Sequence, residues 1–323
     1  MIEPSHPAGN GLRQISELAE AAGSRWTGDT LPLPASVGHG YIRSLSPEPG
    51  VRLGIHHYTL AQEVVVHRYP DATAPEALLL SCQAFDTTVT RGRLSTAQLA
   101  STTLGFTTTL PAHTEMLLVT LLIERARLTD WLAGAEHLPP IFPLGSAPLV
   151  LDALLTPELQ TVLREISSPR PAQALTQFFY RIKAQELVYW LLQELAQRTG
   201  PTRPVHTADV ARIYQFRDRL LAQLSAAPSL PDLAQAVGLS QTKLNLLFRQ
   251  IFGSSPYEYF QQARLAQAKH QLQFLSVSEV GYHLGFTNLS HFARLFQRHY
   301  GLTPKKYQAA LPRGVTDKSG GLD

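Results

Sequence analysis

The chain has a single cysteine, Cys82, among its 323 residues. One cysteine cannot form an internal disulfide, so we expect a protein of a reducing compartment, the cytoplasm. Apolar runs are short: the longest begin at Met116 (MLLVTLLI) and Leu187 (LVYWLL), far below the length needed to cross a bilayer. The opening residues, MIEPSHPAGN, have neither the basic nor the apolar part of a signal peptide. These absences predict a protein with no membrane partner.

Signatures of catalysis are also missing. The sequence has no Gly-rich phosphate loop and no Gly-x-Ser-x-Gly elbow, which leaves nucleotide hydrolysis and esterase chemistry without support. His56 and His57 adjoin in an expected strand, so their side chains point to opposite faces and cannot easily share an ion. We therefore predict no enzymatic activity, no cofactor and no metal, and we interpret Cys82 as a buried core residue.

The chain does contain a degenerate repeat near its end. The first copy runs from Leu233 to Tyr259 and the second from Val280 to Tyr307. The matched pairs are Gly238 with Gly285, Leu244 with Phe292, Leu247 with Leu295, Phe248 with Phe296, Gly253 with Gly301, Pro256 with Pro304 and Tyr259 with Tyr307. The offset is 47 residues up to the first glycine and 48 from Leu244 onward, so the second copy carries one extra residue after its turn.

Each copy has the pattern of a helix-turn-helix unit. The turn glycines, Gly238 and Gly285, can take the left-handed conformation that ends a helix. Ser240 and Thr287 then stand where an N-cap of the next helix is wanted. That helix places apolar residues on one face and polar residues on the other, the layout in which a second helix enters the major groove. Two such units in tandem predict a DNA-binding regulator.

These motifs resemble a known family. The run GFTNLSHFARLF from Gly285, GLTP from Gly301 and the connecting PYEYFQQARLAQAKHQL from Pro256 are similar to the DNA-binding domain of the AraC/XylS family of bacterial transcription regulators. The resemblance covers roughly residues 205–311. FYRIKAQELVYWLLQEL from Phe179 and KLNLLFRQIFG from Lys243 look like the branch that includes pyochelin-receptor regulators.

Charge is distributed as this resemblance implies. Residues 205–313 carry twelve Lys and Arg against five Asp and Glu, a net charge of +7, whereas residues 1–204 carry −3. A basic C-terminal part on a mildly acidic N-terminal part suits a phosphate-binding module joined to a sensing module.

The outward residues of the second helices are the candidate DNA contacts. For base edges we predict Thr242, Lys243, Asn245 and Leu246 in the first unit, and Leu289, Ser290, His291 and Arg294 in the second. Asn can pair bidentately with adenine and Arg with guanine. For phosphates we predict Arg249, Arg298, Lys305 and Lys306. Leu246 and Leu289 depart from the polar residues that the family commonly carries there, and a solvated helix face is the alternative for every one of these positions.

The predicted fold class is α+β. Six strands are expected, starting at Val51, Glu63, Ala77, Asp86, Leu104 and His113, with helices over residues 15–22, 128–133, 157–166 and 171–198. Residues 1–135 would form a cupin-like β-barrel that senses an effector, and residues 136–200 would form helices for interdomain or dimer packing. Residues 205–311 would form the all-α double helix-turn-helix domain, followed by a flexible tail at 312–323.

The sequence therefore predicts a ligand-responsive transcription regulator that reads two successive major grooves. Its partners would be double-stranded promoter DNA, an unknown small-molecule effector, RNA polymerase and a second copy of the chain; activation and polymerase recruitment follow from the resemblance. An effector-independent DNA-binding protein and a cupin-type enzyme fused to a DNA-binding domain remain the alternatives. A DNA-repair methyltransferase needs several cysteines, which a lone Cys82 does not supply.

Overall fold

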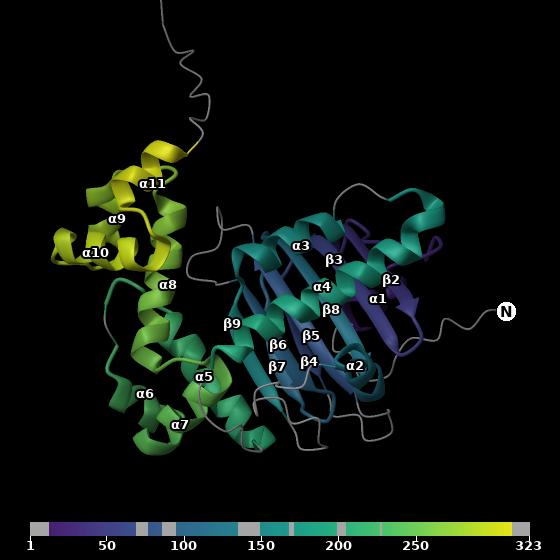
Figure 1. Ribbon diagram of the computed structural model, residues 1–323, viewed down its shortest axis with the longest axis horizontal. Helices are drawn as coiled ribbons and strands as arrows, with labels where there is room; N and C mark the ends of the chain where they lie inside the picture. Colours follow the sequence, from purple (N-terminus) through teal and green to yellow (C-terminus); the bar gives the residue numbers. More distant parts are fainter. Residues whose placement is uncertain are drawn as a thin grey trace, which may run out of the picture.

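The computed structural model describes residues 13–68, 77–85, 95–134, 149–167, 171–198, 205–226 and 228–311. An antiparallel sheet flanked by helices fills the N-terminal part, and helices alone fill the C-terminal part (Figure 1). This arrangement is the predicted α+β architecture.

Seven strands form one antiparallel sheet. Their order is β1 (Thr30–Pro32), β2 (Gly38–Glu48), β3 (Val51–Leu60), β8 (Glu115–Glu124), β5 (Ala77–Phe85), β6 (Thr96–Ser101) and β9 (Val150–Leu154). A separate pair joins β4 (Val64–Arg68) to β7 (Phe106–Leu110). Closure into a cupin-like barrel stays a prediction, because β1 and β9 are the two edges of the described sheet.

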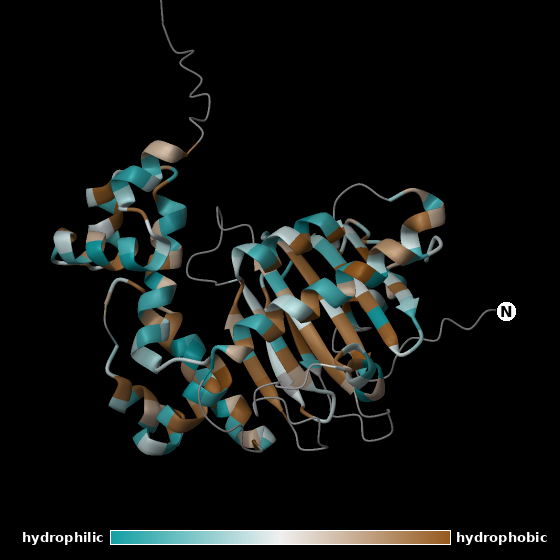
Figure 2. Ribbon diagram, viewed as in Figure 1, coloured by the Kyte–Doolittle hydropathy of each residue, from teal (hydrophilic) through white to brown (hydrophobic). Residues whose placement is uncertain are grey.

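Helices α3 (Pro157–Ser167) and α4 (Thr176–Ala196) cover one face of the sheet, and the strands beneath them are strongly apolar (Figure 2). Alternation places Leu53 and Ile55 of β3 on this face, against Leu187 of α4. Burying each such side chain stabilises the fold by about 1.5–3 kcal/mol. A short 3₁₀ turn, η1 (Gln173–Leu175), leads into α4, and α2 (Arg125–Trp131) follows β8.

The opposite face of the sheet packs on α1 (Arg13–Ala21) and on the β4–β7 pair. Tyr58 and Met116 project there and form a smaller apolar cluster with Ile15, Val66 and Leu110. The neighbouring residue His56 shares this face and is buried, whereas His57 is on the other side of the strand, half-exposed, with Nε2 at 2.7 Å from a carboxylate oxygen of Glu115. The predicted separation of the two histidines is confirmed.

The predicted strands starting at Val51, Glu63, Ala77, Leu104 and His113 correspond to β3, β4, β5, β7 and β8, whereas the Asp86 run lies outside the described residues. We did not predict β2, because its glycines, Gly38 and Gly40, are uncommon in strands and suggest a loop. A Cβ on Gly40 would lie 2.2 Å from the carbonyl oxygen of His57, so this close strand pairing requires glycine.

The sheet extends past residue 135, where we predicted that the β-rich domain ends, so that predicted boundary is wrong. β9 pairs with β6, so the sheet continues into the region 136–200 that we expected to be helical. Five apolar-rich residues, VLDAL, are too short a run to be told from a helix by periodicity.

The C-terminal part contains seven helices among its described residues. They are α5 (Thr207–Leu221), α6 (Leu230–Ala236), α7 (Gln241–Phe252), α8 (Pro256–Gln271), α9 (Val277–His283), α10 (Leu289–Tyr300) and α11 (Pro304–Ala310). The long α8 connects the α6–α7 pair to the α9–α10 pair (Figure 1).

Candidate nucleic-acid interface

The first helix-turn-helix unit consists of α6 and α7. Gly238 turns the chain between them with φ of 68°, in the left-handed region that glycine favours. Ser240 is the N-cap of α7, because its Oγ accepts a hydrogen bond from the amide of Lys243 at 3.3 Å. Both roles predicted for this turn are confirmed.

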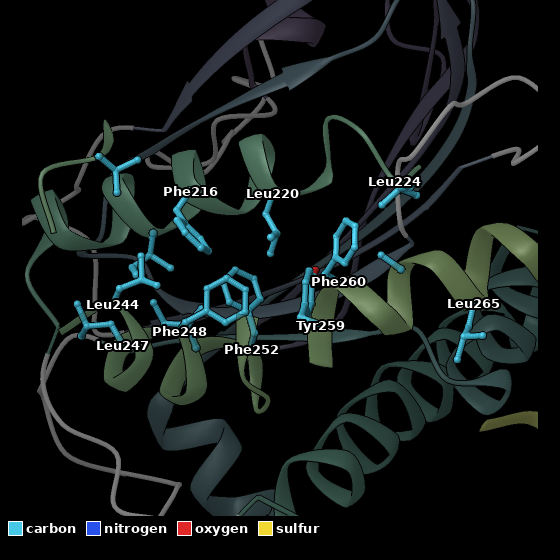
Figure 3. Close-up of a cluster of buried hydrophobic side chains, with 14 of the residues drawn as sticks. Phe216, Leu220, Leu224, Leu244, Leu247, Phe248, Phe252, Tyr259, Phe260 and Leu265 are labelled. Atoms are coloured by element: carbon cyan, nitrogen blue, oxygen red, sulfur yellow. The ribbon is translucent and has the colours of Figure 1, made fainter. Parts of the chain in front are cut away.

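Aromatic side chains pack against the buried face of α7. Phe248 and Phe252 on α7, whose ring centroids are 4.4 Å apart, pack against Phe216 of α5 and Tyr259 of α8 at centroid distances of 5.0–5.6 Å (Figure 3). Such contacts are worth about 0.5–1.5 kcal/mol each beyond the area that they bury. The inner face of α7 is therefore held rigidly, which leaves the outer face to present side chains.

The second unit repeats this design with α9 and α10. Gly285 turns the chain with φ of 71°, and both α7 and α10 end at a left-handed glycine with φ of 75°, Gly253 and Gly301. Phe292 and Phe296 of α10 are completely buried. The sequence repeat is thus a structural repeat.

One predicted cap is wrong. Asn288, and not Thr287, is the N-cap of α10: its Oδ1 accepts a hydrogen bond from the amide of His291 at 3.0 Å. The extra residue of the second copy explains the error, because it lies between Gly285 and the cap. Ser240 therefore matches Asn288 at the offset of 48 residues, and Thr287 lies exposed in the turn.

The predicted reading residues of the first unit lie on the outer face of α7. Thr242, Asn245 and Leu246 are all exposed, Leu246 to 49% of its surface. Lys243 is also exposed, but its Nζ lies 2.9 Å from Oδ1 of Asp209, a mostly buried residue of α5. Sequence reasoning missed Asp209, since 34 residues separate the pair and no local pattern signals it.

In the second unit three predicted reading residues project freely from α10. Ser290, His291 and Arg294 are exposed. Leu289 is half-buried, and a Cβ added to Gly281 of α9 would lie 2.3 Å from its Cδ2. The Leu289 side chain therefore packs over the glycine of the preceding helix and contributes to the junction between α9 and α10.

The predicted phosphate contacts flank these faces. Arg249 on α7 and Arg298 on α10 are exposed, as are Lys305 and Lys306 in the first turn of α11. Thr303 caps that turn by accepting from the amide of Lys306 at 3.4 Å. Each unit thus presents polar reading residues with basic side chains beside them, a composition suited to a DNA groove and its phosphates.

The described residues offer neither a metal site nor a membrane-spanning helix. These contain no group of three or more His, Cys, Asp or Glu side chains that could hold a metal ion, and no helix long and apolar enough to cross a membrane. Cys82 is fully buried, as predicted, and burial raises the pKa of its thiol to about 12.

The C-terminal repeat is similar in sequence to known helix-turn-helix proteins. A family model described as a helix-turn-helix domain matches residues 233–310. The HTH-type transcriptional activator RhaS of Yersinia pestis (strain Pestoides F) is 33% identical over 102 residues, which cover 31% of this chain and 37% of the relative. The chain thus aligns with little more than a third of that relative's length.

Two solved structures are also similar. A transcriptional regulator with an AraC-type DNA-binding domain from Chromobacterium violaceum is 28% identical, with a TM-score of 0.31, over 33% of this chain and 99% of that one. ToxT of Vibrio cholerae, solved with an unsaturated fatty acid, is 11% identical with a TM-score of 0.32, over 83% of this chain and 98% of that one.

Proposed function

We propose that this chain is a DNA-binding transcription regulator of the AraC/XylS family and that it acts as a ligand-responsive activator; its match to the helix-turn-helix domain over residues 233–310 and its similarity to RhaS support the proposal. The observation that carries this proposal is the repeat itself: two capped helices, α7 and α10, with polar outer faces and a common connecting helix, α8. Recognition helices on one DNA face need a separation of about 34 Å, one helical turn.

In this proposal the reading residues are those that the sequence predicts. Thr242, Asn245 and Leu246 contact bases from α7, with Lys243 positioned by Asp209, and Ser290, His291 and Arg294 contact bases from α10. Arg249, Arg298, Lys305 and Lys306 contact phosphates. Leu289 contributes through its packing on Gly281. The chain acts by binding DNA in the cytoplasm and catalyses no reaction.

The effector would bind on the sheet face that packs against α1 and the β4–β7 pair. Two buried polar atoms on that face, Nδ1 of His56 and the hydroxyl oxygen of Tyr58, have no hydrogen-bond partner among the described residues. Burial lowers the pKa of His56 to about 4, so its ring is neutral near pH 7. A ligand with hydrogen-bonding groups on an apolar body would satisfy both atoms.

A second copy of the chain is the partner that we propose for α4. Leu175, just before α4, and Phe178, Ile182 and Tyr189 on α4 form an apolar stripe that is exposed to 42–57%, and Phe179 beside them is half-buried. The face of α4 that packs on the sheet is a different one, built from Tyr180, Ala184, Leu187, Val188, Leu191 and Leu195. An exposed apolar stripe of this length suits an isologous contact between two such helices.

Mobility shifts with the promoter region beside the protein's own gene test the proposal. Arg294→Ala should weaken specific binding by about 5–150-fold, which corresponds to the roughly 1–3 kcal/mol of a bidentate base contact. Arg52→Ala, at an exposed position of β3, is the matched control and should change nothing. Binding no tighter than to random DNA, and insensitive to Arg294→Ala, would refute a sequence-specific role.

A further inference from the structure

The first helix-turn-helix unit is docked on the β9 edge of the sheet. Helices α5 and α7 lie beside this edge (Figure 1), and Val150 of β9 belongs to the same apolar cluster as Phe216 and Phe248. The principal contacts of α10, by contrast, are with α8, α9 and α11. The sheet therefore contacts the first DNA-binding unit directly, whereas α10 of the second unit packs mainly on other helices of the C-terminal part.

Arg198, just beyond α4, joins the two parts. Its guanidinium donates to the carbonyl oxygen of Asp152 in β9 and, at 2.9 Å, to the carbonyl oxygen of Ile251 in the last turn of α7. Unpaired carbonyls at a helix C-terminus favour a cation. A Cβ on Gly253 would lie 2.7 Å from Nε of Arg198, so the glycine that ends α7 also makes room for this contact.

The side chain of Asp152 lies inside this interface, 1% exposed, and is poorly satisfied. Among the residues that the structure describes, its Oδ2 accepts one hydrogen bond, from the hydroxyl of Tyr214 at 3.2 Å, and Nη1 of Arg217 is 3.8 Å away. Oδ1 has no hydrogen-bond partner among the described residues. The side-chain amide of Gln98 in β6 donates to the hydroxyl oxygen of Tyr214 at 2.7 Å, and not to the carboxylate of Asp152.

A carboxylate can accept about four hydrogen bonds, and burying one with fewer disfavours its charged form. We infer that Asp152 is a release element: its charge destabilises the docked arrangement and lets the first helix-turn-helix unit leave the sheet edge. In the free arrangement water solvates the carboxylate, and the first unit moves with the second through α8 instead of with the sheet.

The surroundings of Asp152 disfavour its charged form in the docked arrangement. Burial is the largest influence and raises the pKa of Asp152 from 3.8 to about 6, although Arg217, Tyr214, Arg198 and Gln98 each lower it. A group whose pKa is higher in the docked state binds its proton more tightly there. Docking is therefore favoured as the pH falls through about 6, and it weakens as the pH rises through that value.

The distance between the two parts tests the inference. Gln62→Cys and Gln235→Cys place spin labels on exposed positions of the turn between β3 and β4 and of α6, and the buried Cys82 does not compete for the label. In the full chain we expect a docked and a free population at about pH 7.5. Acidification to about pH 5 should raise the docked-to-free ratio about tenfold.

Variants separate the inference from a merely structural role. Asp152→Asn should raise the docked fraction at about pH 7.5 and abolish its pH dependence, whereas Tyr214→Phe, which removes the hydroxyl that donates to Oδ2, should lower that fraction. Asp218→Asn removes an exposed carboxylate from the same Arg217 and should change neither quantity. Loss of docking in Asp152→Asn, or a pH response that persists in it, would overturn the inference. DNA is absent from this experiment, so its outcome is independent of the proposed function.

Discussion

Nε of Arg264 in α8 donates to the carbonyl oxygen of Leu284, at the end of α9, over 2.9 Å. The guanidinium also lies over the ring of Phe286, 3.9 Å from its centroid, and the whole residue is 6% exposed. The connecting helix thus grips the turn of the second unit through one buried cation.

Arg264→Met should destabilise the second unit, because it leaves the Leu284 carbonyl buried without a donor. We expect a loss of about 1–3 kcal/mol in the free energy of unfolding. Urea denaturation measures it, with Arg298→Met on the exposed face of α10 as the control, expected within about 0.5 kcal/mol of the parent. Equal midpoints for the two variants would contradict this role.

The two turn glycines should differ in their tolerance of alanine. Both have positive φ, which costs a residue with a Cβ roughly 1–2 kcal/mol. At Gly238 no atom lies within 4 Å of the added Cβ, so this cost is all that we expect. At Gly285 the Cβ would lie 1.6 Å from the backbone oxygen of Ser225, and the loss should exceed about 3 kcal/mol. Thermal unfolding of both variants decides; equal losses would disprove the close approach.

The basic side chains beside the reading faces should act on all DNA sequences alike. Arg298→Ala and Lys305→Ala should each reduce the slope of log affinity against log salt by about 1, because each removes one phosphate contact. Affinity for specific and random duplexes should fall together. A change in base preference, with an unchanged slope, would reassign the residue to base reading.

The apolar stripe of α4 should control self-association. Phe178→Glu places like charges opposite one another in an isologous contact, and we expect the dimer dissociation constant to rise at least about tenfold. Gln177→Glu, an exposed neighbour that adds the same charge, serves as control. Sedimentation equilibrium distinguishes them, and a parent chain that is monomeric at every concentration would exclude this partner.

Local patterns predicted the local structure well. Glycines with positive φ, the serine before α7 and the alternating apolar residues of β3 each act over a few residues, so the sequence displays their roles. Lys183 and Glu186, one turn apart on α4, form an ion pair at 2.7 Å, a contact that depends in the same way on local spacing. The second partner of Lys183, Glu165 of α3, depends on how two helices pack and could not be predicted.

Contacts between distant segments account for what the sequence concealed. Asp152 meets Tyr214 across 62 residues, and its burial depends on how β9 and α5 approach each other. The N-cap of α10 escaped prediction for a smaller reason: one inserted residue shifts the alignment between Gly285 and Asn288, and either Thr287 or Asn288 has a suitable side chain.

The position of β9 bears on aggregation. Edge strands carry unpaired amide and carbonyl groups that recruit strands from other molecules, and proteins protect them by covering them or by placing charges on them. In the docked arrangement α7 lies against β9 and Arg198 occupies one of its carbonyls. Once the first unit leaves, the Asp152 carboxylate is the charge that discourages strand addition in an otherwise apolar segment. The residue that favours release would then also keep the released molecule from polymerising.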